Sequence, residues 1–271
     1  MTHHALILAL LIALSACAHT PAPITHAGPQ VLLLGEVHDS AAGHAARADM
    51  LRAKLATGWR PAIAMEQFDT DQQPALDAAM RECADAACVI AEVAPAKSSW
   101  TWAYYKPVIA LALQYKLPLY GANLSRGEAS KVVKDGFAAA LPAALIAQYS
   151  LDTLPATVLT AQENAVRDSH CGALPEALVS PMAKAQIARD VVMAQTLRMH
   201  ATNGIVLIAG NGHVRSDIAV PYWLQRDGLR VHTVGFLEPD TDTIAFDDIR
   251  HIPASTRADP CVGFKTGKPA G

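Results

Sequence analysis

Short apolar runs that do not alternate with polar residues constrain the fold of this chain most strongly. Residues 31–34 are VLLL and residues 205–208 are IVLI, and similar runs occupy 60–68, 117–123 and 229–237. Continuous apolar runs predict strands that are covered on both faces, as in a parallel sheet. Because helical patterns separate the runs, we expect an α/β fold with a mainly parallel central sheet and helices on both faces.

The helical patterns also indicate how the chain is organised. Helices are expected at 40–58, 73–87, 106–115 and 182–202. Residues 126–180 are alanine-rich and interrupted by prolines at 142, 155, 175 and 181, which predicts an inserted, cap-like helical region. With 51% hydrophobic residues in a chain of 271, one large core is feasible, so we expect a single domain over 30–253 and a loosely held tail at 254–271.

The N-terminal segment predicts export. Its apolar stretch of about ten residues is too short to span a membrane and has the length of a signal-peptide core. The sequence LSAC at 14–17 resembles the lipobox of bacterial lipoproteins, although no lysine or arginine precedes the apolar core. We therefore expect residues 1–16 to be removed, Cys17 to be acylated, and the proline-rich residues 17–29 to form a tether.

The other cysteines are even in number, which suits disulfides in an exported protein. Cys83 and Cys88 are close enough in sequence to close a small loop, which would leave Cys171 with Cys261. Four cysteines nevertheless allow three connectivities, and free buried thiols are the alternative. Their spacing matches no zinc motif.

Polar side chains stand at the ends of four predicted strands. They are Glu36 and His38 after the first strand, Glu66 and Asn123 on the second and third, and His213 after the fourth. One polar residue at such a position is most often a cap or a turn former. The carboxyl ends of parallel strands, however, share one edge of the sheet, and ligands bind at that edge. We therefore expect these side chains to converge on one crevice.

Carboxylates and imidazoles together permit three kinds of chemistry. They suit a divalent metal such as zinc or manganese. Its ligands would be Glu36, His38, Glu66 and His213. Alternatively, a histidine oriented by a carboxylate acts as a general base. The third alternative is a polar floor beneath a ligand, to which His44 could add an imidazole and Arg215 a guanidinium that binds carboxylates or propionates.

Several other function classes lack support. The chain has no G-x-S-x-G motif, no H-E-x-x-H motif and no P-loop, and the glycines at 210 and 212 do not complete G-x-G-x-x-G. The net charge of -3 offers no basic surface for phosphates, so we expect no nucleic-acid partner.

Six ordered blocks between about residues 30 and 236 resemble the ChaN-like haem-binding uptake lipoproteins, which belong with the Tiki proteases and erythromycin esterases in one superfamily. The blocks are LLGEVHDS with His44, AMEQFD with Gln73, YYKPVIALALQYKLPLYGANLSR, HCGALPE, AQIARDVVMAQ and IAGNGHVRSDIAVP. The resemblance implies an outer-membrane lipoprotein that faces the periplasm. It also implies that the protein binds haem through a tyrosine for iron uptake, as a dimer with haems stacked face to face.

The other branches of the superfamily imply a different use of the same residues. In those branches the strand-end glutamates and histidines hold a metal or act as acid and base. The positions that match in this chain are Gly35, Glu36, His38, Glu66 and His213.

Tyr105 and Tyr222 are the candidate haem ligands under the ChaN resemblance. Phenolate is a hard anionic oxygen that suits ferric haem. Because the ordinary pKa of tyrosine is about 10, a neighbouring arginine or histidine would be needed to favour the anion. We expect residues 100–105 and the helical insertion to wall the haem site. The alternative is that both tyrosines are packed aromatic residues with hydrogen-bonded hydroxyls.

Three hypotheses for the function follow. The first is a lipid-anchored haem-binding protein of iron uptake. The second is a hydrolase, either metal-dependent or using glutamate and histidine as acid and base in the same crevice. The third is an interaction module with a vestigial catalytic crevice.

Overall fold

The structure is a computed structural model that describes residues 30–95, 98–225, 228–239, 241, 245–259 and 261–262. The expected signal peptide, the acylated Cys17 and the tether all lie outside the described residues. Of the expected tail at 254–271, only a part up to residue 262 is described.

Six parallel strands form the centre of the molecule in the order β3-β2-β4-β1-β5-β6. They are β1 (Val31–Leu34), β2 (Ala62–Asp69), β3 (Leu119–Asn123), β4 (Ile205–Ile208), β5 (Val231–Leu237) and β6 (Asp248–His251). The first five coincide with the predicted apolar runs. The sixth was not predicted, because a largely exposed edge strand with the sequence DIRH needs no apolar run.

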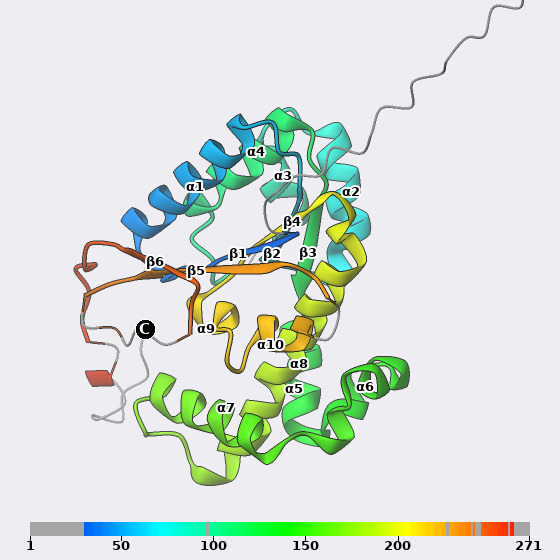
Figure 1. Cartoon of the computed structure of the whole chain (residues 1–271), viewed down its shortest axis with the longest axis vertical. Helices are drawn as coiled ribbons and strands as arrows, with labels where there is room; N and C mark the ends of the chain where they lie inside the picture. Colours follow the sequence, from blue (N-terminus) through cyan, green and yellow to red (C-terminus); the bar gives the residue numbers. More distant parts are fainter. Residues whose placement is uncertain are drawn as a thin grey trace, which may run out of the picture.

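Helices cover both faces of the sheet, which confirms the predicted α/β fold (Figure 1). One face carries α1 (Ala41–Ala56), α2 (Gln73–Glu82), α3 (Ala86–Val93) and α4 (Lys106–Tyr115). The other side carries α5 (Arg126–Asp135), α6 (Ala143–Tyr149), α7 (Ala156–Ser169), α8 (Glu176–His200), α9 (Asn211–Val214) and α10 (Val220–Leu224). Short 3-10 turns occupy Thr70–Gln72, Trp102–Tyr104, Phe137–Ala139, Leu151–Thr153 and Ala201–Asn203.

Alternate strand residues enter the two cores. In β1, Leu32 and Leu34 pack with the helices of the first face, whereas Val31 and Leu33 pack with α8 and its neighbours. All four side chains are fully buried. A strand buried on both faces has no polar alternation, and this explains why the apolar runs predicted the parallel sheet correctly.

Two helices differ from the sequence-based expectation. The helix expected at 73–87 is divided into α2 and α3 at Cys83, where the backbone becomes extended. The break expected at Pro181 does not occur, because α8 begins at Glu176 and continues through this proline. Proline removes one helical hydrogen bond, and packing of α8 against α5 and α7 compensates for that loss.

Both favoured cysteine pairs are bonded in the structure. Cys83–Cys88 closes the turn between α2 and α3, and Cys171–Cys261 joins the loop between α7 and α8 to the C-terminal segment. Since the second bond links positions 90 residues apart, it fixes the α7–α8 hairpin to the main body of the protein.

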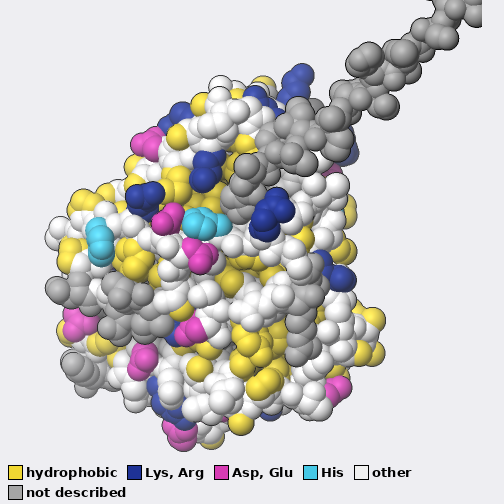
Figure 2. All heavy atoms as spheres, viewed as in Figure 1, with side chains coloured by type: hydrophobic (Ala, Val, Ile, Leu, Met, Phe, Trp, Pro, Cys, Tyr) yellow, Lys and Arg dark blue, Asp and Glu magenta, His cyan; other side chains and the backbone are white. Residues whose placement is uncertain are grey.

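The surface of the described residues carries both signs of charge. On the face shown in Figure 2, lysine and arginine side chains are interspersed with acidic ones, and apolar side chains gather over α8 and α10. None of the helices within the described residues is long and apolar enough to cross a membrane.

Candidate functional site

A cavity of about 570 Å³ lies at the carboxyl edge of the sheet. Loops after β1 and β4 form its floor, and helices α7 and α8 form the facing wall. Its lining consists of Glu36, Val37, His38, Asp39, Gln162, Ala165, Val166, Ser169, Gln186, Gly210, Asn211, Gly212, His213, Arg215, Ile218 and Arg257. Four of the predicted site residues therefore line one cavity, and we call it the strand-tip cavity.

Glu36 is the most heavily bonded group at the floor of this cavity. Its Oε1 accepts hydrogen bonds from the hydroxyl of Tyr105 at 2.6 Å, from Nδ1 of His38 at 2.8 Å and from Nε2 of Gln67 at 3.5 Å. Its Oε2 forms an ion pair with Arg47. The carboxylate is buried, so these donors and this cation replace its hydration.

Arg47 comes from the buried side of α1 and has no exposed surface. Burial lowers its pKa to about 10, so the guanidinium stays charged at neutral pH and balances Glu36. Its second amino group donates to Nδ1 of His44 at 2.9 Å, while Nε2 of His44 donates to the carbonyl of His38 at 3.0 Å. His44 is therefore a buried bridge between Arg47 and the loop after β1, and it does not line the cavity.

A second carboxylate–imidazole group joins His213, which lines the cavity, to Glu66, which is buried and, contrary to the prediction, does not line the cavity. Oε2 of Glu66 accepts a hydrogen bond from the backbone N–H of Gly210 at 2.8 Å, and Oε1 lies 3.6 Å from Nε2 of His213. Nδ1 of His213 donates to Asp190 of α8 at 2.6 Å. His213 thus lies between two carboxylates.

The charge of His213 follows from these neighbours. Burial alone would lower its pKa, but Glu66 and Asp190 outweigh burial and raise the pKa to about 9. Burial raises the pKa of Asp190 to about 6, and His213 opposes that rise. At neutral pH, His213 is therefore an imidazolium that compensates two buried carboxylates.

Gly210 brings the two groups together. A Cβ at this position would lie 2.9 Å from Nε2 of His38 and 3.7 Å from Oε2 of Glu66. Any side chain would therefore press on the His38 ring and fill the space between the two groups. The glycine that follows β4 keeps this part of the floor open.

Asn123 ends β3 as predicted, but it does not line the strand-tip cavity. Its amide oxygen accepts a hydrogen bond of 2.6 Å from Arg189 of α8, which also donates to the carbonyl of Leu124. Burial lowers the pKa of Arg189, and Glu66 and Asp190 oppose that effect. Asn123 therefore helps to position α8, the helix that supplies Asp190.

The candidate tyrosines are placed differently from the expectation. Tyr105 has no exposed surface, and burial raises its pKa well above the usual range, an effect that the nearby Arg47 only partly opposes. Tyr222 lines a separate cavity of about 370 Å³ with Tyr149 and Trp223. All six tyrosines fall within the described residues, and none of them lines the strand-tip cavity.

The aromatic segment at 100–105 packs mainly into the core below the floor. Tyr105 makes edge contacts with Trp100 and Trp102, and Trp102 packs on Phe68. Only Trp100 reaches the His38 ring, with 5.1 Å between ring centroids. The helical insertion, through α7, provides the wall that had been expected from both segments.

Two guanidinium groups stand at the rim of the strand-tip cavity. Arg215 forms a two-point ion pair with Asp217, and Arg257 from the C-terminal segment pairs with Asp39 and Glu238. Both arginines line the cavity and remain partly exposed. Arg215 was predicted, whereas Arg257 was not.

A metal centre has no support in this geometry. Within the described part of the chain, no three His, Cys, Asp or Glu side chains are grouped so that they could hold a metal ion. Arg47 and His213 already provide the positive charge that Glu36 and Glu66 require. The zinc or manganese alternative is therefore not supported.

Sequence patterns contained a signal for two residues that were not predicted. Arg47 lies on the same side of α1 as the buried Ala48, Leu51 and Leu55. Asp190 lies among the buried apolar residues of α8. A charged residue on an apolar helix face marks a buried partner for another charge.

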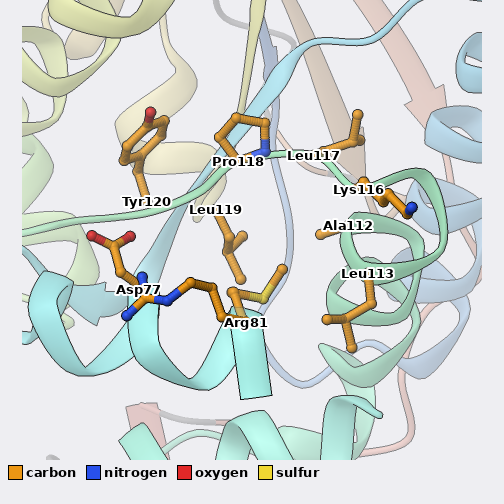
Figure 3. A pocket seen from close by; sticks show the side chains of 10 residues that line it. Asp77, Arg81, Ala112, Leu113, Lys116, Leu117, Pro118, Leu119 and Tyr120 are labelled. Carbon is orange, nitrogen blue, oxygen red and sulfur yellow. The ribbon is translucent and has the colours of Figure 1, made fainter. Parts of the chain in front are cut away.

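A further cavity, of about 360 Å³, lies near the start of β3, away from the strand tips (Figure 3). Asp77 and Arg81 of α2, Lys116 at the end of α4, and Tyr120 are among its lining residues. It contains none of the predicted site residues and lies at the amino end of the strand, so it is separate from the strand-tip cavity.

Comparisons with known proteins agree with the sequence resemblance. The family described as haem-binding uptake, Tiki superfamily, ChaN matches residues 25–224. The solved structure of ChaN of Campylobacter jejuni, described by its cofacial haem binding, covers 81% of this chain and 86% of its own at 23% identity, with a TM-score of 0.66. A mutant of the erythromycin esterase EreC is similar at 14% sequence identity, with a TM-score of 0.47. The match covers 78% of this chain and 70% of the EreC chain. No curated protein sequence matches the chain.

Proposed function

The chain belongs to the haem-binding uptake family of the Tiki superfamily that includes ChaN, and from this premise we propose that it binds haem in the strand-tip cavity. The observation that carries the proposal is the position of this cavity. It lies at the carboxyl edge of a parallel sheet, and its volume of about 570 Å³ lies within the range of cofactor sites.

The lining of the cavity suits the parts of a haem molecule. Val37, Ala165, Val166 and Ile218 provide apolar surface for the macrocycle. Arg215 and Arg257 at the rim provide guanidinium groups that can bind the two propionates. Haem would bring redox-active iron to this floor, and the residues of the chain would bind and orient it.

A haemin titration followed by visible absorption tests the proposal. Ala165→Trp places a large ring in the wall of the cavity and should weaken binding at least about tenfold, which corresponds to about 1.4 kcal/mol. Ala144→Trp on the exposed surface of α6 is the matched control and should bind like the wild type. Equal binding by both variants would place haem elsewhere.

We also propose that the protein is anchored through Cys17 in the outer membrane, faces the periplasm and serves iron uptake. The lipobox resemblance supports the anchor, and two disulfides support an oxidising compartment. Cys17→Ser should move the protein from the membrane fraction to the soluble periplasmic fraction. A variant that still fractionates with membranes would contradict the anchor.

Dimerisation with stacked haems is a further part of the proposal, supported by the cofacial haem binding described for ChaN of Campylobacter jejuni. Sedimentation analysis should show a larger species on addition of haemin. An unchanged sedimentation coefficient of the haem-loaded protein would contradict the stacked dimer.

Acid–base hydrolysis is the second candidate function. The observation that favours it is that two histidines with different surroundings line one cavity. His38 is half-exposed and bonded to one carboxylate, whereas His213 is an imidazolium between two carboxylates. In that case His38 would act as base and His213 as acid. A panel of chromogenic esters should then show turnover that needs no haem and is lost in both His38→Ala and His213→Ala.

A further inference from the structure

Positive charge gathers at the amino edge of the sheet, opposite the strand-tip cavity. Arg60, Lys116 and Arg230 stand in the loops that lead into β2, β3 and β5, and all three are exposed. We call the described residues of these loops, and of the loop that leads into β4, the amino-edge surface: 57–61, 116–118, 201–204, 225 and 228–230. No acidic residue is among them. Arg226 and Asp227 of the last loop, which lie outside the described residues, have opposite charges.

The acidic side chains of this edge stand at its far end. Asp247 and Asp248 are at the start of β6, the last strand of the sheet. Both are bonded: Asp247 accepts hydrogen bonds from Thr233, and Asp248 accepts one from His232. Charge is therefore uneven along the edge, and the part near β2 and β3 is the basic one.

The cavity of about 360 Å³ in Figure 3 lies on this basic side. Arg81 in the last turn of α2 and Lys116 at the end of α4 line it, and neither forms an ion pair with a described acidic side chain. Asp77 also lines the cavity, and its carboxylate accepts a hydrogen bond of 2.8 Å from Gln73. The apolar part of the lining includes Met80, Leu113, Leu117 and Leu119. One net positive charge beside apolar walls suits a phosphodiester that carries one negative charge and an apolar group.

Two half-buried aromatic side chains accompany these cations. Trp59 packs over Gly204, where a Cβ would lie 2.8 Å from Nε1 of the indole. The guanidinium of Arg60 lies over the ring of Tyr115, 4.6 Å from its centroid. Tryptophan and tyrosine are enriched at the interface between membrane and water, because one end of each side chain is apolar and the other is polar. The edge thus combines the two residue classes that bind a lipid headgroup layer.

The chain also enters the fold at this edge. Gln30 directly precedes β1, and the segment that begins at Cys17 leads up to it. β1 and β3 are separated by three strand spacings, so their starts are about 14 Å apart along the edge. A lipid on Cys17 would therefore bring the basic side of this edge, and no other edge of the sheet, close to the bilayer.

We propose that the amino-edge surface rests on an anionic phospholipid leaflet, with Arg81 and Lys116 bound to the phosphate of one headgroup and Trp59 at headgroup level. The inference rests on the proposed anchor at Cys17 and adds a second, noncovalent attachment to it. Each lysine or arginine near an anionic bilayer strengthens binding about fivefold.

The test is cosedimentation of the full chain carrying Cys17→Ser with lipid vesicles. Because this variant cannot be acylated, the result does not depend on whether the anchor exists. Vesicles that contain phosphatidylglycerol should bind the protein at low ionic strength, and added salt should weaken that binding. Vesicles of phosphatidylcholine alone should bind it much less. Equal binding to both kinds of vesicle, or no binding to either, would overturn the proposal.

A pair of double variants separates the cavity from the overall charge of the protein. Arg81→Gln with Lys116→Asn should weaken binding to phosphatidylglycerol about 25-fold, at about fivefold for each cation. Lys131→Gln with Lys134→Gln removes the same charge from exposed positions of α5, which begins beyond the carboxyl end of β3, and should bind like the parent. Equal losses in both double variants would show that only net charge matters and would contradict the assigned surface.

Tryptophan fluorescence tests the orientation independently. Phospholipids with spin-labelled headgroups should quench the emission of the bound protein, and Trp59→Phe should remove most of that quenching. Trp100→Phe is the matched control and should retain it, because Trp100 packs on His38 near the opposite edge. Quenching that persists in Trp59→Phe would contradict the orientation. Glycerol phosphate that displaces the protein from vesicles at millimolar concentration would show a site for soluble anions and would overturn the membrane contact.

Discussion

His38 and His213 lie at the same edge of the sheet, each beside a glutamate, yet their surroundings are opposite. His38 is 52% exposed and bonded to one carboxylate, which Arg47 already neutralises. His213 is 14% exposed and lies between two carboxylates, and this raises its pKa to about 9. The same pair of residue types thus gives a half-exposed imidazole in one place and a largely buried cation in the other. A third charged group causes the difference. Arg47 neutralises the glutamate beside His38, whereas Asp190 adds a second carboxylate beside His213.

The largest effect that we predict concerns the support of the His213 side. Replacing Cys171 and Cys261 by serine removes a link between positions 90 residues apart and should lower the free energy of unfolding by about 4–5 kcal/mol. The disulfide fixes the hairpin whose second helix supplies Asp190, so NMR signals of the His213 ring should shift more than those of His38.

The matched control is the replacement of Cys83 and Cys88, which are only five residues apart and should cost about 2 kcal/mol. Urea denaturation measures both variants. A larger loss from the short loop, or equal NMR shifts at the two histidines, would contradict the prediction.

The next effect concerns the cation on the His38 side. Arg47→Leu leaves the buried Glu36 without its counter-charge and should cost about 3–5 kcal/mol in urea unfolding. Arg52→Leu, at an exposed position of the same helix, should change the stability by no more than about 0.5 kcal/mol. Adding Glu36→Gln to Arg47→Leu should recover part of the loss. Similar stabilities for the two arginine variants would show that Glu36 does not depend on Arg47.

The third effect is a pH dependence that only the His213 side should produce. Because the folded pKa of His213 is raised to about 9, its contribution to stability is complete below pH 6.5, the ordinary value, and disappears as pH rises through 9. Between these values the free energy of unfolding should fall by about 2–3 kcal/mol more in the wild type than in His213→Gln. Urea unfolding at both pH values measures the difference. Parallel behaviour of the two proteins would contradict the charge assigned to His213.

The smallest effect concerns His38 itself. His38→Ala removes a half-exposed side chain and leaves Glu36 bonded to Tyr105 and Arg47, so the stability should change by about 0.5 kcal/mol or less. His213→Ala, which leaves two buried carboxylates uncompensated, should cost several times more. Thermal unfolding of the two variants without haem makes the comparison, and equal losses would remove the distinction between the two histidines.

The sequence was sufficient for the main architecture because apolar runs report burial on both faces. Five strands and their common edge follow from these runs, and the parallel arrangement brings Glu36, His38 and His213 to one cavity. The strand β6 escaped detection because an exposed edge strand carries no such run. The helix break predicted at Pro181 is absent, because packing along α8 compensates for one lost hydrogen bond.

The charges that distinguish the two histidines could not be assigned from the sequence alone. Arg47 and Asp190 come from helices whose pairing with the strand tips depends on the tertiary fold. Tyr105 was singled out as a candidate haem ligand, but whether its hydroxyl faces a cavity or a carboxylate depends on the packing of Trp100 and Trp102.

The direction of β1 has a consequence for how the proposed lipoprotein would be oriented. β1 begins at Val31 on the amino edge of the sheet, and the strand-tip cavity opens at the opposite edge. Twelve residues lie between Cys17 and Gln30, and the thirteen steps from one Cα to the other can extend to about 45 Å. A lipid at Cys17 would therefore attach the protein through the edge of the sheet opposite the cavity, and the reach of this segment would allow the cavity to lie well away from the bilayer.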